Sequence, residues 1–113
     1  MSKYPIDKVK NLYEFLDIMR IRPGMYIGKK SITVLHDYIG GYEWACYVHK
    51  IEENLIPTFE SFNGFVEAYF HYGKTSLNWK GIILEQNNGN EELAFEEFYR
   101  LFDLFRKRIK SEN

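Results

Sequence analysis

The strongest structural signal in this sequence is the run Asn90-Glu91-Glu92-Leu93-Ala94-Phe95-Glu96-Glu97-Phe98-Tyr99-Arg100-Leu101-Phe102-Asp103-Leu104-Phe105-Arg106-Lys107-Arg108-Ile109. Its apolar side chains recur at three- and four-residue steps, which places them on one face of an α-helix. Asn90 is a good N-cap, and the acidic first turn and basic last turn both complement the helix dipole. We therefore predict a long amphipathic helix with the buried stripe Ala94, Phe98, Leu101, Phe102, Phe105 and Ile109.

Two further helices are predicted before this one, in the first half of the chain. The first covers 5–22, with Pro5 in its first turn and Pro23 ending it. The second begins after the N-cap Ser31 and continues to about Glu53. The apolar residues that set the helical spacing are Val9, Leu12, Phe15, Leu16 and Met19 in the first, and Ile32, Leu35, Ile39, Tyr42, Ala45, Cys46 and His49 in the second.

The segment between these helices and the last one predicts two shorter helices. One covers 60–72 and ends at Gly73, and the other is capped by Ser76 and closes near Asn87-Asn88-Gly89. Aromatic and β-branched residues within 64–72 and 77–86 leave short strands as an alternative there. The expected fold is mainly α: a compact bundle of about five helices in a single domain, 1–113.

Glycines and prolines mark two special positions. In Arg22-Pro23-Gly24-Met25-Tyr26-Ile27-Gly28, Pro followed by Gly predicts a type II turn, with Met25, Tyr26 and Ile27 anchoring it. Gly40 and Gly41 weaken the middle of the second helix, so we expect them to serve close packing, a kink or access to a ligand.

The composition indicates a folded protein of a reducing compartment. The chain has 113 residues, of which 45% are hydrophobic and 18% aromatic, enough for one core and for an exposed aromatic surface. The single cysteine and the lack of a secretory leader pattern favour the cytoplasm, and no apolar run is long enough to span a bilayer. A net charge of −1 makes a nucleic-acid partner unlikely.

The sequence offers no arrangement of residues that is typical of catalysis. Cys46 and His49 share a helix face, but a structural zinc site needs four ligands and no second Cys/His pair exists. A nucleophilic Cys46 would need His36, His49 or His71 as a base, and no local signature surrounds it. We therefore predict no enzyme, no metal and no cofactor.

Two charged surfaces are candidates for partner binding. Arg22, Tyr26, Lys29 and Lys30 would form a basic and aromatic edge around the Pro23-Gly24 turn, unless this turn serves only to join two helices. Glu91, Glu92, Glu96 and Glu97 form an acidic helix face, which is either simply solvated or a docking patch for a basic protein. The predicted partner-binding residues are Arg22, Tyr26, Lys29, Lys30, Glu92, Glu96 and Glu97.

The segment 22–28 resembles, residue for residue, a stretch near the N-terminus of the gyrase B subunit and its ATPase relatives. That resemblance implies ATP binding. In those enzymes the following helix carries an Asn and acidic residues for Mg-ATP, and a Gly-rich lid comes later. Here the following helix, 35–44, has no Asn, and no Gly-rich loop follows it. We interpret this match as coincidental.

A second resemblance covers nearly the whole chain. It rests on Arg22 to Ser31, Gly40-Gly41-Tyr42, 62–66, 79–85, 92–95 and 98–102, in that order. This pattern resembles a group of small, largely uncharacterised bacterial proteins, some encoded beside polymorphic or contact-dependent toxins and regarded as their immunity proteins. The resemblance implies a non-enzymatic immunity or antitoxin protein that binds a toxin. The alternatives are a structural or regulatory interaction protein acting as a homodimer, or an enzyme or small-ligand binder with a deep pocket lined by His36, Tyr42, Trp44 or His71.

Overall fold

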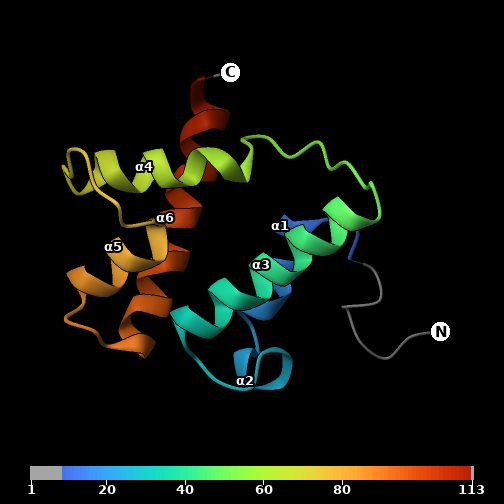
Figure 1. Ribbon diagram of the computed structural model, residues 1–113, viewed down its shortest axis with the longest axis horizontal. Helices are drawn as coiled ribbons and strands as arrows, with labels where there is room; N and C mark the ends of the chain where they lie inside the picture. The colour runs from blue at the N-terminus through green and yellow to red at the C-terminus, as the bar shows by residue number, and fades with distance from the viewer. Residues whose placement is uncertain (1–8, 113) are drawn as a thin grey trace.

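The described part of the chain contains five long helices, one short helix and one 3₁₀ turn, joined by loops. The structure is a computed structural model that describes residues 9–112, and the side chains of residues 9–107. In chain order the helices are α1 (Leu12–Met19), α2 (Pro23–Tyr26), α3 (Ile32–Val48), α4 (Phe62–Tyr69), α5 (Trp79–Gln86) and α6 (Glu91–Glu112), with a 3₁₀ turn at Phe59–Ser61 (Figure 1). Residues 9–112 contain no strand, so the prediction of a mainly α bundle of about five helices is confirmed.

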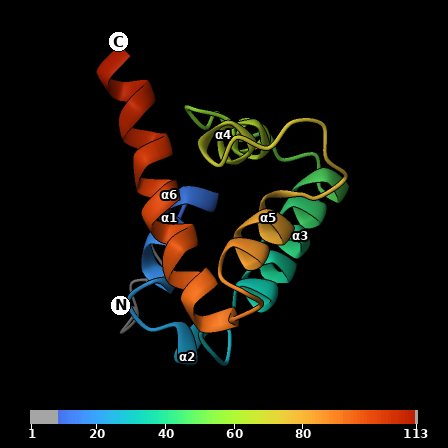
Figure 2. The ribbon, with the colours of Figure 1, turned by 90° about the vertical axis from the view of Figure 1, so that its left-hand side faces the viewer.

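The long helix α6 organises the bundle. It packs against α3, α4 and α5, and α5 in turn packs against α3 and α4. Figure 2 shows α3 and α5 side by side, with α6 and α1 on the other flank. The Tyr99 hydroxyl of α6 donates to the Leu16 carbonyl of α1 at 2.7 Å, and Arg106 pairs with Asp17 at 2.7 Å. The result is one compact body in which every long helix covers α6 or a neighbour of α6.

The core is an aromatic cluster centred on Phe62 of α4. This side chain is fully buried, and its ring centroid lies between 5.2 and 6.2 Å from six other rings. These belong to Phe59, Phe65, Trp79, Phe98, Phe102 and Phe105. Most of the ring pairs are edge-to-face, the arrangement that aromatic quadrupoles favour. The predicted α6 stripe is confirmed from Ala94 to Phe105, whereas the side chain of Ile109 lies outside the described residues.

The helix starts are set by Asn and Ser side chains. Ser31 caps α3 by accepting from the Val34 N–H, and Asn90 caps α6 by accepting from the Leu93 N–H at 2.9 Å, both as predicted. Two other predicted starts are wrong. Helix α1 begins at Leu12 after the N-cap Asn11, and α5 begins at Trp79 after Asn78 instead of Ser76. Pro5 lies outside the described residues.

Three helix ends also differ from the prediction. Helix α1 ends at Met19, before the predicted end at Arg22. Helix α4 ends at Tyr69, and the left-handed residue after it is His71, with φ of 59°, and not Gly73. Helix α3 ends at Val48, five residues before the predicted Glu53, with Lys50 left-handed at φ of 56°. After both α4 and α3 the next N–H bonds back to a carbonyl of the last turn, a closure that offsets the cost of a non-glycine residue there.

The Pro23-Gly24 segment is a turn of helix and not the predicted type II turn. The Ile27 N–H donates to the Pro23 carbonyl at 2.9 Å, and Pro23 occupies the first position of α2, where its fixed φ fits a helix. The left-handed glycine is Gly28, with φ of 88°. Of the predicted anchors, Ile27 is buried and Tyr26 packs against the core, but Met25 is exposed.

Only the first half of α3 is buried, contrary to the predicted stripe. Ile32, Leu35 and Ile39 are in the core, whereas Ala45 and His49 are exposed. Gly40 and Gly41 are exposed as well, and a Cβ on either would meet nothing within 4 Å, so they serve no close packing. The C-terminal half of α3 is therefore not buried in the core that covers its N-terminal half.

Within the part of the chain that is described, no helix is long and apolar enough to cross a membrane.

Glu91 joins the N-terminus of α6 to that of α3. Its carboxylate accepts from the Ser31 hydroxyl at 2.8 Å, the Thr33 N–H at 2.9 Å and the Thr33 hydroxyl at 2.7 Å. Partial burial acts to raise the pKa of Glu91, but these hydrogen bonds outweigh it and hold the pKa below its usual value. Glu91 is thus a structural link and not part of a solvated acidic face.

Replacing Glu91 with Gln is expected to lower the free energy of unfolding at pH 7 by about 1–2 kcal/mol, because hydrogen bonds to a charged group are lost. Since the folded-state pKa is depressed, the contribution is complete above the unfolded pKa and is lost as the pH falls through the folded pKa. Urea unfolding at pH 7 and pH 3 checks this, with Glu92→Gln as the control for the charge change. Equal losses for Glu91→Gln at both pH values would contradict it.

Candidate functional site

The predicted basic edge lies around α2. Arg22 and Lys29 are exposed, and Tyr26 is half-buried against the core. Lys30 is not available as a free cation, because its Nζ donates to the Glu96 carboxylate and forms an ion pair with it. This hydrogen bond raises the pKa of Lys30. The structure therefore brings together one residue from each of the two predicted surfaces.

The predicted acidic face on α6 is largely neutralised by neighbouring cations. Glu96 pairs with Lys30, and Glu97 receives two hydrogen bonds from Arg100, at 2.7 and 2.8 Å. Arg100 also donates to the Tyr69 hydroxyl at 3.1 Å. Of the three predicted carboxylates, Glu92 alone is exposed with neither a hydrogen bond nor an ion pair among the described residues.

Replacing Glu96 with Ala is expected to change the free energy of unfolding by less than about 1 kcal/mol, because its ion pair with Lys30 is exposed to solvent. Thermal unfolding of Glu96→Ala beside Lys30→Ala and the double variant gives the pair's coupling energy. A coupling energy above about 2 kcal/mol would show that this ion pair holds α6 to the loop before α3. The exposure of the pair to solvent argues against so large a coupling energy.

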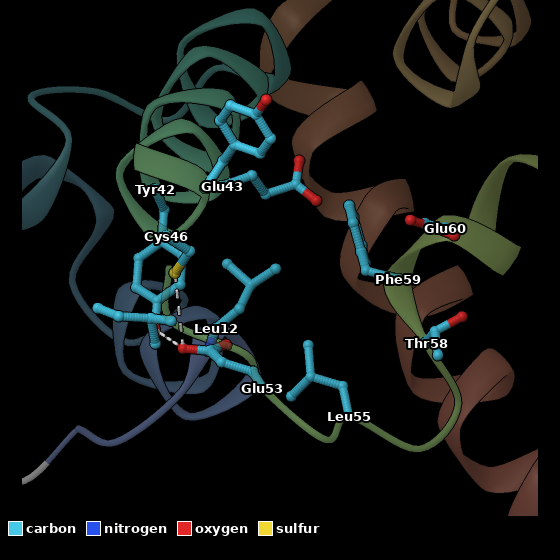
Figure 3. A pocket seen from close by; sticks show the side chains of 11 residues that line it. Leu12, Tyr42, Glu43, Cys46, Glu53, Leu55, Thr58, Phe59 and Glu60 are labelled. Atoms are coloured by element: carbon cyan, nitrogen blue, oxygen red, sulfur yellow. Dashed lines mark hydrogen bonds between the residues drawn. The ribbon is translucent and has the colours of Figure 1, made fainter. Parts of the chain in front are cut away.

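A different site is formed where α3 meets the segment that follows it. A cavity of about 340 Å³ lies between the C-terminal half of α3 and residues 51–60 (Figure 3). Its volume is at the lower end of the range typical of ligand pockets, roughly 300–1,000 Å³. None of its lining residues is basic: they are Leu12, Tyr42, Glu43, Cys46, Tyr47, Ile51, Glu53, Leu55, Thr58, Phe59 and Glu60.

The innermost carboxylate of this cavity, Glu53, is fixed by three neighbours. It accepts from the Leu12 N–H at the start of α1 at 2.9 Å and from the Tyr42 hydroxyl, and the Cys46 thiol lies 3.9 Å from it (Figure 3). Partial burial and the Glu53 charge raise the pKa of the Cys46 thiol, which disfavours the thiolate that a nucleophile requires. Cys46 and Glu53 are therefore suited to holding the wall of the cavity, not to covalent chemistry.

The other two carboxylates are unpaired. Among the described residues, Glu43 and Glu60 have no hydrogen bond and no ion pair. Figure 3 shows Glu43 extending from α3 towards Phe59, with Glu60 beyond it. Although the Glu43 side chain is exposed to solvent, desolvation by the surrounding wall, followed by the negative charge of Glu60, raises the pKa of Glu43. Glu43 and Glu60 thus place negative charge at the cavity that no hydrogen-bond donor or ion-pair partner among the described residues compensates.

An exposed apolar surface adjoins the cavity. Trp44, Tyr47, Val48 and Ile51 are 67%, 75%, 55% and 55% exposed, and we call these four residues the α3 patch. The rings of Trp44 and Tyr47 are stacked, with centroids 5.5 Å apart. Tyr47 and Ile51 also line the cavity, so the α3 patch and the cavity form one continuous surface.

The sequence analysis missed this site, although one local signal was present. Trp44, Tyr47, Val48 and Ile51 are spaced as one helical stripe, separate from the Ile32-Leu35-Ile39 stripe that is buried. Of the four residues suggested as lining a pocket, Tyr42 lines the cavity, whereas His36, Trp44 and His71 do not.

Residues 9–112 hold no group of three or more His, Cys, Asp or Glu side chains placed to bind a metal ion.

Comparison with known proteins finds no match to this chain. No protein-family model, no curated protein and no solved structure matches this chain.

Proposed function

We propose that this chain is a non-enzymatic binding protein of the cytoplasm that neutralises a basic bacterial toxin, and that it binds this toxin through the α3 patch and the neighbouring cavity. The observation that carries the proposal is the α3 patch: four large apolar side chains exposed within residues 44–51, two of them stacked aromatics, in the segment that also carries the cavity carboxylate Glu43. Contiguous exposed apolar surface rimmed by polar groups is typical of protein interfaces.

The composition of the patch supports a protein partner. Trp and Tyr are the residues most often found to dominate binding energy, because they bury large rigid surfaces. Trp44 and Tyr47 lie on a regular helix, so little conformational entropy would be lost when they are covered. A rigid aromatic anchor of this kind suits tight, stoichiometric inhibition.

The charge around the patch supports a basic partner. Residues 41–60 contain four Glu and one Lys, and the carboxylates of Glu43 and Glu60 have no cation beside them in the described chain. Charge complementarity of this kind steers association and selects the partner. A toxin that acts on nucleic acid presents such a basic surface. The resemblance to immunity proteins supports the same reading.

The test is affinity purification of the tagged full chain from its native host at moderate salt, followed by mass spectrometry. The proposal predicts one stoichiometric basic polypeptide that is recovered with the wild type and with the Leu104→Ala control, but not with the Trp44→Ala/Tyr47→Ala variant. Leu104 is also exposed but lies on α6.

Two results would contradict the proposal. Recovery of the chain alone, as a dimer that the patch variant dissociates, would favour a homo-oligomeric structural or regulatory protein. Recovery of the same polypeptide by the patch variant, but not by a Glu92→Ala/Glu96→Ala/Glu97→Ala variant, would move the interface to α6.

A further inference from the structure

The cavity beside the α3 patch has a chemical character of its own. Three carboxylates line it, no basic residue does, and its remaining wall is apolar and aromatic apart from Cys46 and Thr58. Glu53 is already occupied by the Leu12 N–H and the Tyr42 hydroxyl. Glu43 and Glu60 have no hydrogen bond and no ion pair with any described group. They lie near enough to each other for the charge of Glu60 to raise the pKa of Glu43.

We propose that this cavity binds a guanidinium group carried on an aliphatic chain, supplied by an arginine side chain of the partner protein. The inference rests on the proposed function for the identity of the partner, but not for the chemistry of the cavity. A cation placed between Glu43 and Glu60 would relieve their mutual repulsion, and its stem would lie against Leu55 and Phe59.

Two features favour arginine over lysine. A guanidinium is planar and donates two parallel hydrogen bonds to a carboxylate, whereas an ammonium is a compact, strongly hydrated charge. The phenol ring of Tyr47 lines the cavity and stacks on Trp44, so it offers an aromatic face at the edge of the cavity on which a guanidinium can lie. The volume of about 340 Å³ suits a single side chain better than a larger ligand.

The test uses n-butylguanidinium as the probe and follows the amide signals of the ¹⁵N-labelled full chain by NMR. The proposal predicts saturable shifts at Glu43, Cys46, Glu53 and Glu60, with a dissociation constant in the millimolar range. The neutral isostere n-butylurea should bind at least about tenfold more weakly, because the charge contributes most of the binding energy.

Variants of the carboxylates test the assignment. Glu43→Gln and Glu60→Gln should each weaken n-butylguanidinium binding by about five- to tenfold, whereas Glu52→Gln, an exposed carboxylate that does not line the cavity, should leave it unchanged. Both substitutions are on exposed side chains, and an unchanged spectrum in the absence of probe shows that the fold is kept. Equal binding of n-butylurea, no saturable shift, or an equal loss in Glu52→Gln would overturn the proposal.

The two proposals fail in different ways. If n-butylguanidinium binds but no protein partner is recovered, the cavity is an organic-cation site and the toxin-binding function is wrong. If a partner is recovered and the Glu43→Gln/Glu60→Gln variant binds it as tightly as the wild type, the toxin-binding function stands and the arginine anchor is wrong.

Discussion

Phe98→Ala is expected to lower the free energy of unfolding by about 3–5 kcal/mol, the cost typical of truncating a fully buried phenylalanine. Phe98 has no exposed surface, and its ring lies 5.4 Å from Phe62 of α4 and 5.0 Å from Trp79 of α5. Removing it leaves a void at the point where α4, α5 and α6 meet. Because domains of this size are stable by only about 5–15 kcal/mol in total, the loss is large.

Urea unfolding followed by circular dichroism measures this effect. Leu104→Ala on the same helix is the matched control, because Leu104 is 40% exposed and its truncation should cost less than about 1 kcal/mol. A loss below about 1 kcal/mol for Phe98→Ala would mean that the α6 stripe is not the centre of the core.

The second large effect concerns binding. Trp44→Ala is expected to weaken the complex with the toxin by about 2–4 kcal/mol, roughly 30- to 1,000-fold, which is the range of an aromatic hot spot at the centre of an interface. The melting temperature should stay nearly unchanged, because Trp44 is 67% exposed and its only ring contact in the described chain is with Tyr47.

Isothermal titration of the purified partner into wild type, Trp44→Ala and Leu104→Ala checks the prediction. Affinity unchanged within about threefold for Trp44→Ala would place the interface elsewhere. A parallel loss of stability would instead show that Trp44 supports the fold of α3.

Local signals explain what could be predicted from the sequence. The α6 stripe and the N-caps Ser31 and Asn90 depend on residues within a few positions of one another, and all three predictions are confirmed. The Asn11 and Asn78 caps were missed because each competes with another plausible start nearby, at Pro5 and at Ser76.

The α3 patch and the cavity depend on contacts between residues that are far apart in the sequence. Such contacts cannot be read from local sequence patterns. The spacing of α3 predicts one stripe, but which part of it is covered depends on which part packs against α5 and α6. The cavity exists because residues 51–60 return beside α3 and Glu53 bonds to Leu12, 41 positions away. In the same way, the Lys30–Glu96 pair joins two surfaces that the sequence analysis treated as separate.

The most direct test of toxin neutralisation is a growth assay with the co-purified polypeptide. We expect that expression of this polypeptide alone arrests growth, that co-expression of the wild-type chain restores it, and that the Trp44→Ala/Tyr47→Ala variant, present at the same level, does not. Growth unaffected by the polypeptide, or restored equally by the variant, would contradict the account.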